Sequence, residues 1–345
     1  MITEGPEPGP DRILWLDGWR GSALLFVLAS HFGGPEYLGR FGVDAFFVLS
    51  GILMAKLLYL RQQPLSAFFA RRAARILPAF LVYTGVVYAA EAWLTGGSTA
   101  LEILSTLVFA RTYVPSDSDR WITELPLAHL WSLNVEEHSY VFLALTAAAL
   151  ARQRARGARL LLGSALVSVA FYLLYRYAAP PSTAMPYAVR TECAAFPLLL
   201  AAGLHLRASV GGPVRSGWRQ HPATVMLLPC LSLGLVAGFH DKMMVTHLLS
   251  PALLALAIHG MLQTGPGPRL AALLSWRPLR LLGTASFSLY LWQQPAHFLI
   301  RNQHVDWSHG QGLLISLVLG ALSFLCIEQP ARRWLVRAFH ADRPT

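Results

Sequence analysis

Long apolar runs separated by short polar connections cover almost the whole chain. Most of these runs are about 17 to 25 residues long, the length that a helix needs to cross the hydrocarbon core of a bilayer. In lipid, every backbone polar group must be paired within its own segment, so runs of this kind are expected to be helical. The predicted membrane-spanning helices lie near 14–33, 42–60, 76–95, 127–150, 160–178, 191–206, 222–240, 244–263, 281–301 and 311–328.

One further apolar run, near 99–114, is shorter and contains Glu102 and Arg111. It lies between basic groups at Arg75 and Arg152, which the positive-inside rule places on the same side of the membrane. An even number of crossings must separate them, so 99–114 is expected to be a re-entrant or interfacial segment on the outer side. The predicted fold class is an all-α polytopic integral membrane protein with about ten transmembrane helices plus this segment.

Composition agrees with a membrane protein. Of the 345 residues, 54% are hydrophobic and 13% are charged, and the mean hydropathy is +0.46, which is far from an ordinary soluble domain. The formal charge of +10 is concentrated in short connections, which indicates contact with membrane lipids and argues against binding of nucleic acid. These basic connections predict that both termini are cytoplasmic.

The domain organisation is expected to be simple. A Gly, Pro and Glu-rich tail at 1–12 precedes a membrane domain at 13–334, which a cytoplasmic tail at 335–345 follows, with no appended soluble domain. The start of the chain lacks the positive charge and apolar run of a signal peptide, so the first span is expected to be retained. Three isolated cysteines show no paired spacing, and no metal site is predicted.

Two ionisable residues lie within the first predicted span. Arg20 and His31 are eleven residues apart, close to three helical turns, so they share one face about 16 Å apart along the helix axis. An ionisable side chain at the centre of a span costs roughly 2.5 to 3.5 kcal/mol on insertion scales, so a functional role is the default interpretation.

Three further motifs carry polar groups. In the second span, Asp44, Phe47 and Gly51 lie within two turns of one face; small residues there permit close packing, but a carboxylate needs a cation, a donor or water. Arg72 and Arg75 are one helical turn apart just before the third span, where a guanidinium pair could hold the phosphates of a donor. An ordinary lipid-headgroup cluster is the alternative for this pair.

The start of the fourth span is the densest motif: its polar and aromatic residues are His129, Trp131, Ser132, Glu136, Glu137 and Tyr140. His129 and Glu136 share a face. Two adjacent carboxylates among Ala, Leu and Val are hard to explain by packing, and one is expected to pair with Arg20 or His31. Near the end of the chain, Trp292 and Gln293 are expected to line a polar cavity.

Taken in order, these motifs resemble the family-3 membrane acyltransferases, which O-acetylate bacterial surface sugars and related acceptors. The resemblance runs from Leu16 to about Trp334. It rests on Arg20 with His31, on Phe-Phe-x-x-Ser-Gly at 46–51, on Arg-x-x-Arg at 72–75, and on His-x-Trp-Ser-Leu with Glu-Glu and Tyr at 129–140. Two positions depart from the family pattern: His138 stands where Gln is common and Gln293 where His is common, so no catalytic role is transferred to Gln293.

The resemblance implies acetyl-CoA or another acyl-CoA as donor substrate, a saccharide hydroxyl as acceptor, and a place in a bacterial inner membrane. His31 would be the general base, oriented by a carboxylate, with Glu136 preferred. The other expected catalytic residues are Arg20, Glu137 and Asp17. The donor-binding residues are expected to be Arg71, Arg72, Arg75, Ser50 and Phe47. The acceptor-binding residues are expected to be Asp44, His129, Trp131, Ser132, Tyr140, Trp292 and Gln293.

Several alternatives stay open at this point. An acyl-His31 relay would replace direct transfer, and a small lipophilic acceptor such as a macrolide would replace the saccharide. A proton-coupled transporter belongs to a different class; the missing inverted repeat and the arginine pair argue against it. The sequence also leaves open the acyl length and a homo-oligomeric state.

Overall fold

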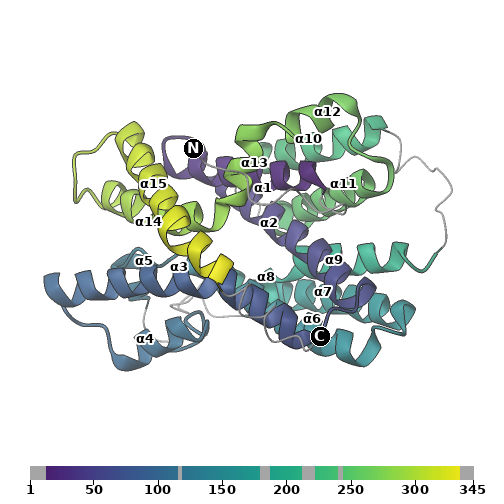
Figure 1. Cartoon of the computed structure of the whole chain (residues 1–345), viewed down its shortest axis with the longest axis horizontal. Coiled ribbons are helices and arrows are strands. Elements are labelled where there is room, and N and C mark those ends of the chain that lie inside the picture. The colour runs from purple at the N-terminus through teal and green to yellow at the C-terminus, as the bar shows by residue number, and fades with distance from the viewer. Residues whose placement is uncertain (1–12, 116–118, 179–186, 212–221, 240–243, 335–345) are drawn as a thin grey trace.

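The computed structural model describes residues 13–115, 119–178, 187–211, 222–239 and 244–334, and every regular element in these ranges is a helix (Figure 1). The all-α class is therefore confirmed. The expected tails at 1–12 and 335–345 lie outside the described residues.

Helix α2 occupies the centre of the molecule. It covers Tyr37–Ala55 and continues into a π-helical turn at Lys56–Leu60. It packs against α1 (Leu14–His31), α9 (Phe196–Ala208) and α11 (Ser250–Thr264) (Figure 1). The motif with Arg20 and His31 on α1 and the motif with Asp44 and Phe47 on α2 are thus carried by neighbouring helices.

The remaining elements surround these helices. They are α3 (Leu65–Leu94), α4 (Ala100–Leu107), α5 (Arg120–Thr123), α6 (Leu130–Leu150), α7 (Arg154–Ala178), η2 (Tyr187–Val189), α8 (Thr191–Ala194), α10 (Pro222–Gly238), η4 (Val245–Leu249), α12 (Pro268–Leu274), α13 (Arg277–Thr284), α14 (Ser286–Arg301), α15 (His309–Ser323) and η5 (Phe324–Glu328).

Five of the described helical segments are long and apolar enough to cross a membrane, so the expected count of ten is not confirmed. They are Tyr37–Leu60, Leu65–Leu94, Arg154–Ala178, Val245–Thr264 and His309–Trp334. Some predicted spans are interrupted: the run at 281–301 is divided between α13 and α14, and the run at 191–206 between α8 and α9. Helix α1 is not among these five segments, because its 18 residues include polar side chains such as those of Asp17 and Arg20.

Helix α3 begins at Leu65, whereas the sequence predicted a start near 76. The additional turns are anchored by Phe68, which is 3% exposed and belongs to the main hydrophobic core. The arginines at 71, 72 and 75 therefore lie inside a long helix. Within this helix they still precede the apolar stretch at 76–94 that the sequence predicts as the third span.

The segment at 99–114 forms the short helix α4 followed by turns. Eight residues of helix extend only about 12 Å, which is too short to cross a bilayer. Glu102 on its inner side is buried and bonds Arg111 at 3.1 Å, while Leu101 and Leu104 are exposed. A buried ion pair with exposed leucines is the arrangement expected of a helix that presents its apolar face to lipid.

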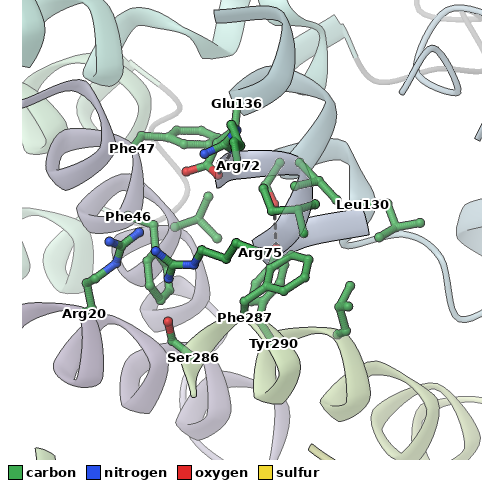
Figure 2. Close-up of a pocket in the computed structure, with 15 residues that line it drawn as sticks. Arg20, Phe46, Phe47, Arg72, Arg75, Leu130, Glu136, Ser286, Phe287 and Tyr290 are labelled. Carbon is green, nitrogen blue, oxygen red and sulfur yellow. Dashed lines mark hydrogen bonds and ion pairs between the residues drawn. The ribbon is translucent and has the colours of Figure 1, made fainter. Parts of the chain in front are cut away.

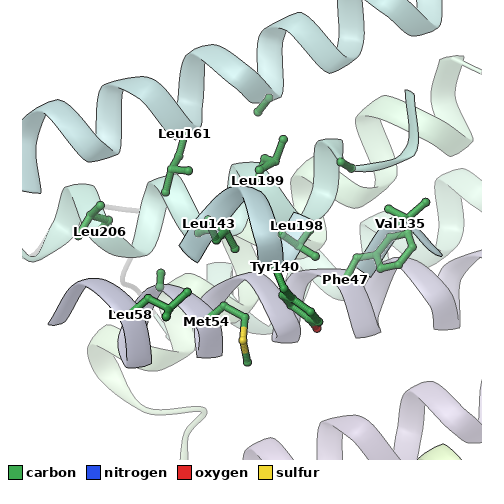
Figure 3. Packing of buried hydrophobic residues seen from close by; sticks show 14 of the residues in the cluster. Phe47, Met54, Leu58, Val135, Tyr140, Leu143, Leu161, Leu198, Leu199 and Leu206 are labelled. Carbon is green, nitrogen blue, oxygen red and sulfur yellow. The ribbon is translucent and has the colours of Figure 1, made fainter. Parts of the chain in front are cut away.

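The largest hydrophobic core joins α2, α6, α7 and α9 (Figure 3). Phe47 and Met54 from α2 meet Tyr140 from α6 and Leu198 from α9, and all four are at most 5% exposed. The backbones approach closely, because a Cβ atom at Gly51 would lie only 2.1 Å from the carbonyl oxygen of Leu198. This packing fixes the face of α2 that carries Ser50.

Candidate active site

Two cavities meet between α1, α2, α3, α6 and α14. The first, here called the arginine cavity, has a volume of about 80 Å³; its polar and aromatic walls include Arg20, Arg72, Arg75, Phe46, Phe47, Ser132, Glu136, Ser286 and Tyr290. The second, the histidine cavity, has about 690 Å³; its walls include His31, His129, His297, Trp121, Trp131, Arg40, Gln294 and Arg301. Val43 and Tyr290 line both cavities, so they form the partition between them.

Arg20 and Arg75 direct their guanidinium groups into the same part of the arginine cavity (Figure 2). The sequence proposed Asp17, Asp44 or Glu136 as the partner of Arg20. The ion pairs found in the described part of the chain do not include Arg20, and its Nε has no hydrogen-bond partner. Glu136 also lines this cavity, but its partners are Ser50 and Arg72, so Arg20 and Arg75 are the guanidinium groups there that remain available to an anion.

Arg72 is engaged within the protein. Its Nε and Nη2 donate to Glu137 Oε1 at 2.9 and 2.7 Å, and its guanidinium lies 3.5 Å from the ring centroid of Tyr140. The exposed Arg71 donates to the carbonyl oxygen of Ala67 at 3.2 Å. The paired phosphate role expected for Arg72 and Arg75 therefore does not fit this geometry, because Glu137 already occupies Arg72.

Glu136 accepts a hydrogen bond from Ser50 Oγ at 2.7 Å and lies 3.5 Å from Arg72. It is not the residue that orients His31, as the sequence had suggested. Ser50 and Glu136 are 86 residues apart in the chain, and the contact between α2 and α6 brings them together.

His31 is held by two residues of α14. Its Nδ1 hydrogen-bonds the side-chain oxygen of Gln293, and its ring stacks on that of His297, with centroids 4.1 Å apart. His297 Nδ1 in turn donates to the carbonyl oxygen of His31 at 3.0 Å. An amide oxygen can only accept, so the proton of neutral His31 lies on Nδ1 and Nε2 is left as the basic nitrogen.

Tyr290, which forms part of the partition between the cavities, is held by hydrogen bonds to neighbouring groups. Ser132 Oγ and the hydroxyl of Tyr290 are 2.8 Å apart, and they donate to the carbonyl oxygen of His129 at 3.0 and 3.1 Å. The His129 side chain is 5% exposed, and neither ring nitrogen has a hydrogen-bond partner. Trp131 lies beside this partition, with its ring centroid 5.8 Å from that of Phe47.

Three residues of the expected site lie elsewhere. Asp44 is buried and pairs with Arg40 at 3.1 Å, so the carboxylate is neutralised within α2. Asp17 lines a third cavity that also includes Arg20. Trp292 packs its ring against Tyr83 with centroids 5.4 Å apart and is not among the residues that line the two cavities.

The sequence did not single out His297 or assign Tyr290 to the site. Both lie on the same helix as Gln293. Tyr290 is three residues before Gln293 and His297 is four residues after it, so all three share a face. That spacing was a usable signal. Within the described ranges, no group of three or more His, Cys, Asp or Glu side chains is placed to hold a metal ion.

Comparison with known proteins identifies relatives over almost the full chain. YrhL of Bacillus subtilis, named as a candidate peptidoglycan O-acetyltransferase, is 29% identical over 94% of this chain and 55% of its own length. The O-acetyltransferase OatA of Staphylococcus aureus is 25% identical, with 96% of this chain and 59% of the relative covered. The peptidoglycan O-acetyltransferase OatA of Listeria monocytogenes is 27% identical, with 92% and 55% covered.

The chain thus spans less than two thirds of the length of these relatives. No solved structure matches it significantly. Residues 13–328 match the family described as "Acyltransferase domain", which covers most of the chain and includes both cavities. The chain therefore belongs to the family-3 acyltransferases.

Proposed function

We propose that this chain is an O-acetyltransferase that moves an acetyl group from acetyl-CoA to a hydroxyl of a cell-wall saccharide. The observation that carries the proposal is the position of His31. Its ring lines the larger cavity, Gln293 holds its Nδ1, and Nε2 is free to accept a proton. The relatives named as peptidoglycan O-acetyltransferases support the acceptor class.

The arginine cavity suits the donor. Acyl-CoA carries phosphates, and Arg20 and Arg75 are the guanidinium groups of this cavity that lack an ion-pair partner among the described residues. This replaces the expected pair of Arg72 and Arg75 by Arg20 and Arg75.

The histidine cavity suits the acceptor. It is several times larger, and it combines the rings of Trp121 and Trp131 with polar side chains, as expected of a site for a polar molecule with apolar faces. His31 and the partition at Tyr290 lie on its wall, so an acceptor hydroxyl there is close to the route from the arginine cavity.

The reaction then needs one base. The acceptor hydroxyl oxygen attacks the thioester carbonyl carbon and forms the new C–O bond, while its proton passes to His31 Nε2. The resulting tetrahedral intermediate collapses, the C–S bond breaks, and the thiolate leaves. The proton from His31 then restores CoA as a thiol, and the acceptor is released as an ester.

The basic connections support an orientation in which the arginine cavity is on the cytoplasmic side. Arg61 follows the end of α2, and Arg71 is next to Arg72 of the arginine cavity, whereas the histidine cavity is lined by Glu36 and Gly39 in and after the connection from α1 to α2. A cytoplasmic donor would then serve an acceptor on the outer side.

Purified protein in detergent, supplied with labelled acetyl-CoA and soluble peptidoglycan fragments, provides the test. We expect CoA thiol release and an acceptor mass increased by one acetyl group. His31→Gln is expected to lower the rate at least about 100-fold, because it removes the base. His304→Gln, an exposed histidine outside the cavities, is the matched control. An unchanged rate in the His31 variant would contradict the proposed role of His31.

A further inference from the structure

His129 is a buried polar side chain beside His31 that the proposed reaction has not used. It lies at the start of α6, is 5% exposed, and lines the histidine cavity together with His31. Both of its ring nitrogens lack a hydrogen-bond partner. An unsatisfied buried polar group costs about 1 to 3 kcal/mol, so such a group in a folded protein calls for an explanation.

The backbone of His129 is fixed to the partition between the cavities. Its carbonyl oxygen accepts hydrogen bonds from Ser132 Oγ and from the hydroxyl of Tyr290, and both of those side chains line the arginine cavity. His129 also lines the histidine cavity, and its buried ring packs edge-on to Tyr83 with centroids 5.4 Å apart. The imidazole is therefore held in place where the acetyl group must pass between the cavities.

Acyl transfer from a thioester places negative charge on the carbonyl oxygen in the transition state, and a preorganised N–H donor stabilises that charge. Gln293 does not supply this donor at the reacting carbon, because its amide nitrogen donates to the carbonyl oxygen of Tyr290 at 3.3 Å. Arg20 lines the arginine cavity and the third cavity, and it is not on the wall that carries His31.

We infer that His129 is a second catalytic residue, whose ring N–H hydrogen-bonds the acetyl carbonyl oxygen as that oxygen becomes negative. A neutral imidazole carries one N–H donor, and in His129 no protein group competes for it. His31 and His129 then divide the work: His31 removes the hydroxyl proton and His129 stabilises the oxyanion. This inference rests on the proposed acetyl transfer.

Two substitutions separate this role from simple packing. His129→Phe keeps a ring in the space beside Tyr83 but removes the donor, and His129→Gln keeps an N–H donor. We expect kcat of the Phe variant to fall about 100-fold or more, with the KM values for acetyl-CoA and acceptor little changed, and the Gln variant to recover most of the loss. A purely structural role would not predict recovery by Gln.

His138→Phe is the matched control. His138 lies on the same helix, but its Nδ1 is already bonded to Thr191 Oγ1 at 2.7 Å, and it lines neither cavity. Its kcat should stay close to wild type. Thermal unfolding in detergent, measured for all three variants, identifies any loss that is due to misfolding.

Wild-type kcat in a folded His129→Phe protein, or an equal loss in the folded Phe and Gln variants, would overturn the inference. If Phe fails to fold, the Gln variant still decides, because it must retain most of kcat. Failure of the proposed function is distinguishable: wild-type protein would then not acetylate the saccharide, or His31→Gln would remain fully active.

Discussion

Gln293 decides which nitrogen of His31 is basic. Its side-chain oxygen accepts from His31 Nδ1, and its own amide nitrogen donates to the carbonyl of Tyr290 and to the side-chain oxygen of Gln294, both at 3.3 Å. These two bonds fix the orientation of the amide. A neutral side chain thus does the orienting that the sequence had given to the carboxylate of Glu136.

Removing this amide should weaken catalysis without weakening donor binding. Gln293→Leu leaves an apolar side chain that cannot accept a hydrogen bond from Nδ1–H, so the His31 ring loses its fixed tautomer. We expect kcat to fall at least about tenfold, with an unchanged KM for acetyl-CoA. Steady-state kinetics with varied acetyl-CoA measure both constants. A larger KM at unchanged kcat would show that Gln293 binds the donor instead.

The two arginines on one turn of α3 should respond differently to substitution. Arg75→Ala removes a guanidinium that faces the arginine cavity, so we expect the Kd for CoA to rise about 10- to 100-fold, with little change in stability. Isothermal titration with CoA measures this change.

Arg72→Ala should instead destabilise the protein. It leaves Glu137 without its partner at a site where both side chains are less than 20% exposed, and we expect a loss of about 2 to 4 kcal/mol. Thermal unfolding in detergent measures the loss. The contrary outcome is an Arg72→Ala variant that binds CoA as weakly as the Arg75→Ala variant and is as stable as the wild-type protein. That result would support the sequence-based prediction that Arg72 and Arg75 together bind the phosphates.

At the scale of elements, the contact between α2 and α9 sets the position of Ser50 and hence of Glu136. Gly51 makes the contact possible, because there is no room for a Cβ atom beside Leu198. Gly51→Ala should therefore lower the free energy of unfolding by about 1 to 3 kcal/mol. Gly85→Ala in α3 is the control: nothing lies within 4 Å of the added Cβ, so helix propensity should raise stability slightly. Equal melting temperatures for the two variants would show that α2 and α9 can separate at no cost.

The individual helices could be predicted from the sequence better than their contacts. The eleven-residue spacing placed Arg20 and His31 on one helix, and α1 carries both. The partner of His31 lies 262 residues away in the chain, and no local periodicity encodes such a pair. The same reason explains Arg72: its position near a basic cluster favoured phosphate binding, whereas the packing of α3 near α6 presents it to Glu137.

The helix boundaries differ from the predicted spans for a related reason. Hydropathy runs continuously through 281–301, but the backbone at Ala285 leaves the helical path, and a hydropathy average does not register one residue. Phe68 extended α3 by packing into the core, although charged residues follow it. Tertiary contacts thus override average hydropathy at the ends of helices.

At the scale of the whole molecule, the proposed orientation can be checked by labelling. In a variant with Cys193, Cys230 and Cys326 replaced, Asp306→Cys should react with a membrane-impermeant maleimide on intact cells. Gln153→Cys, in the exposed connection between α6 and α7, should react only after permeabilisation. Mass shift on a gel reports both. The opposite pattern would invert the orientation, and equal labelling of both on intact cells would place them on the same side.

The shared wall at Val43 and Tyr290 has a consequence for steady-state behaviour. In the proposed function donor and acceptor occupy separate cavities, so neither needs to leave before the other binds, and the reaction should proceed through a ternary complex with intersecting double-reciprocal lines. Product CoA should then be a competitive inhibitor against acetyl-CoA and a noncompetitive inhibitor against the saccharide. A high concentration of saccharide in the wall would not relieve the inhibition by CoA. The ratio of CoA to acetyl-CoA in the cell would therefore set the rate of the modification.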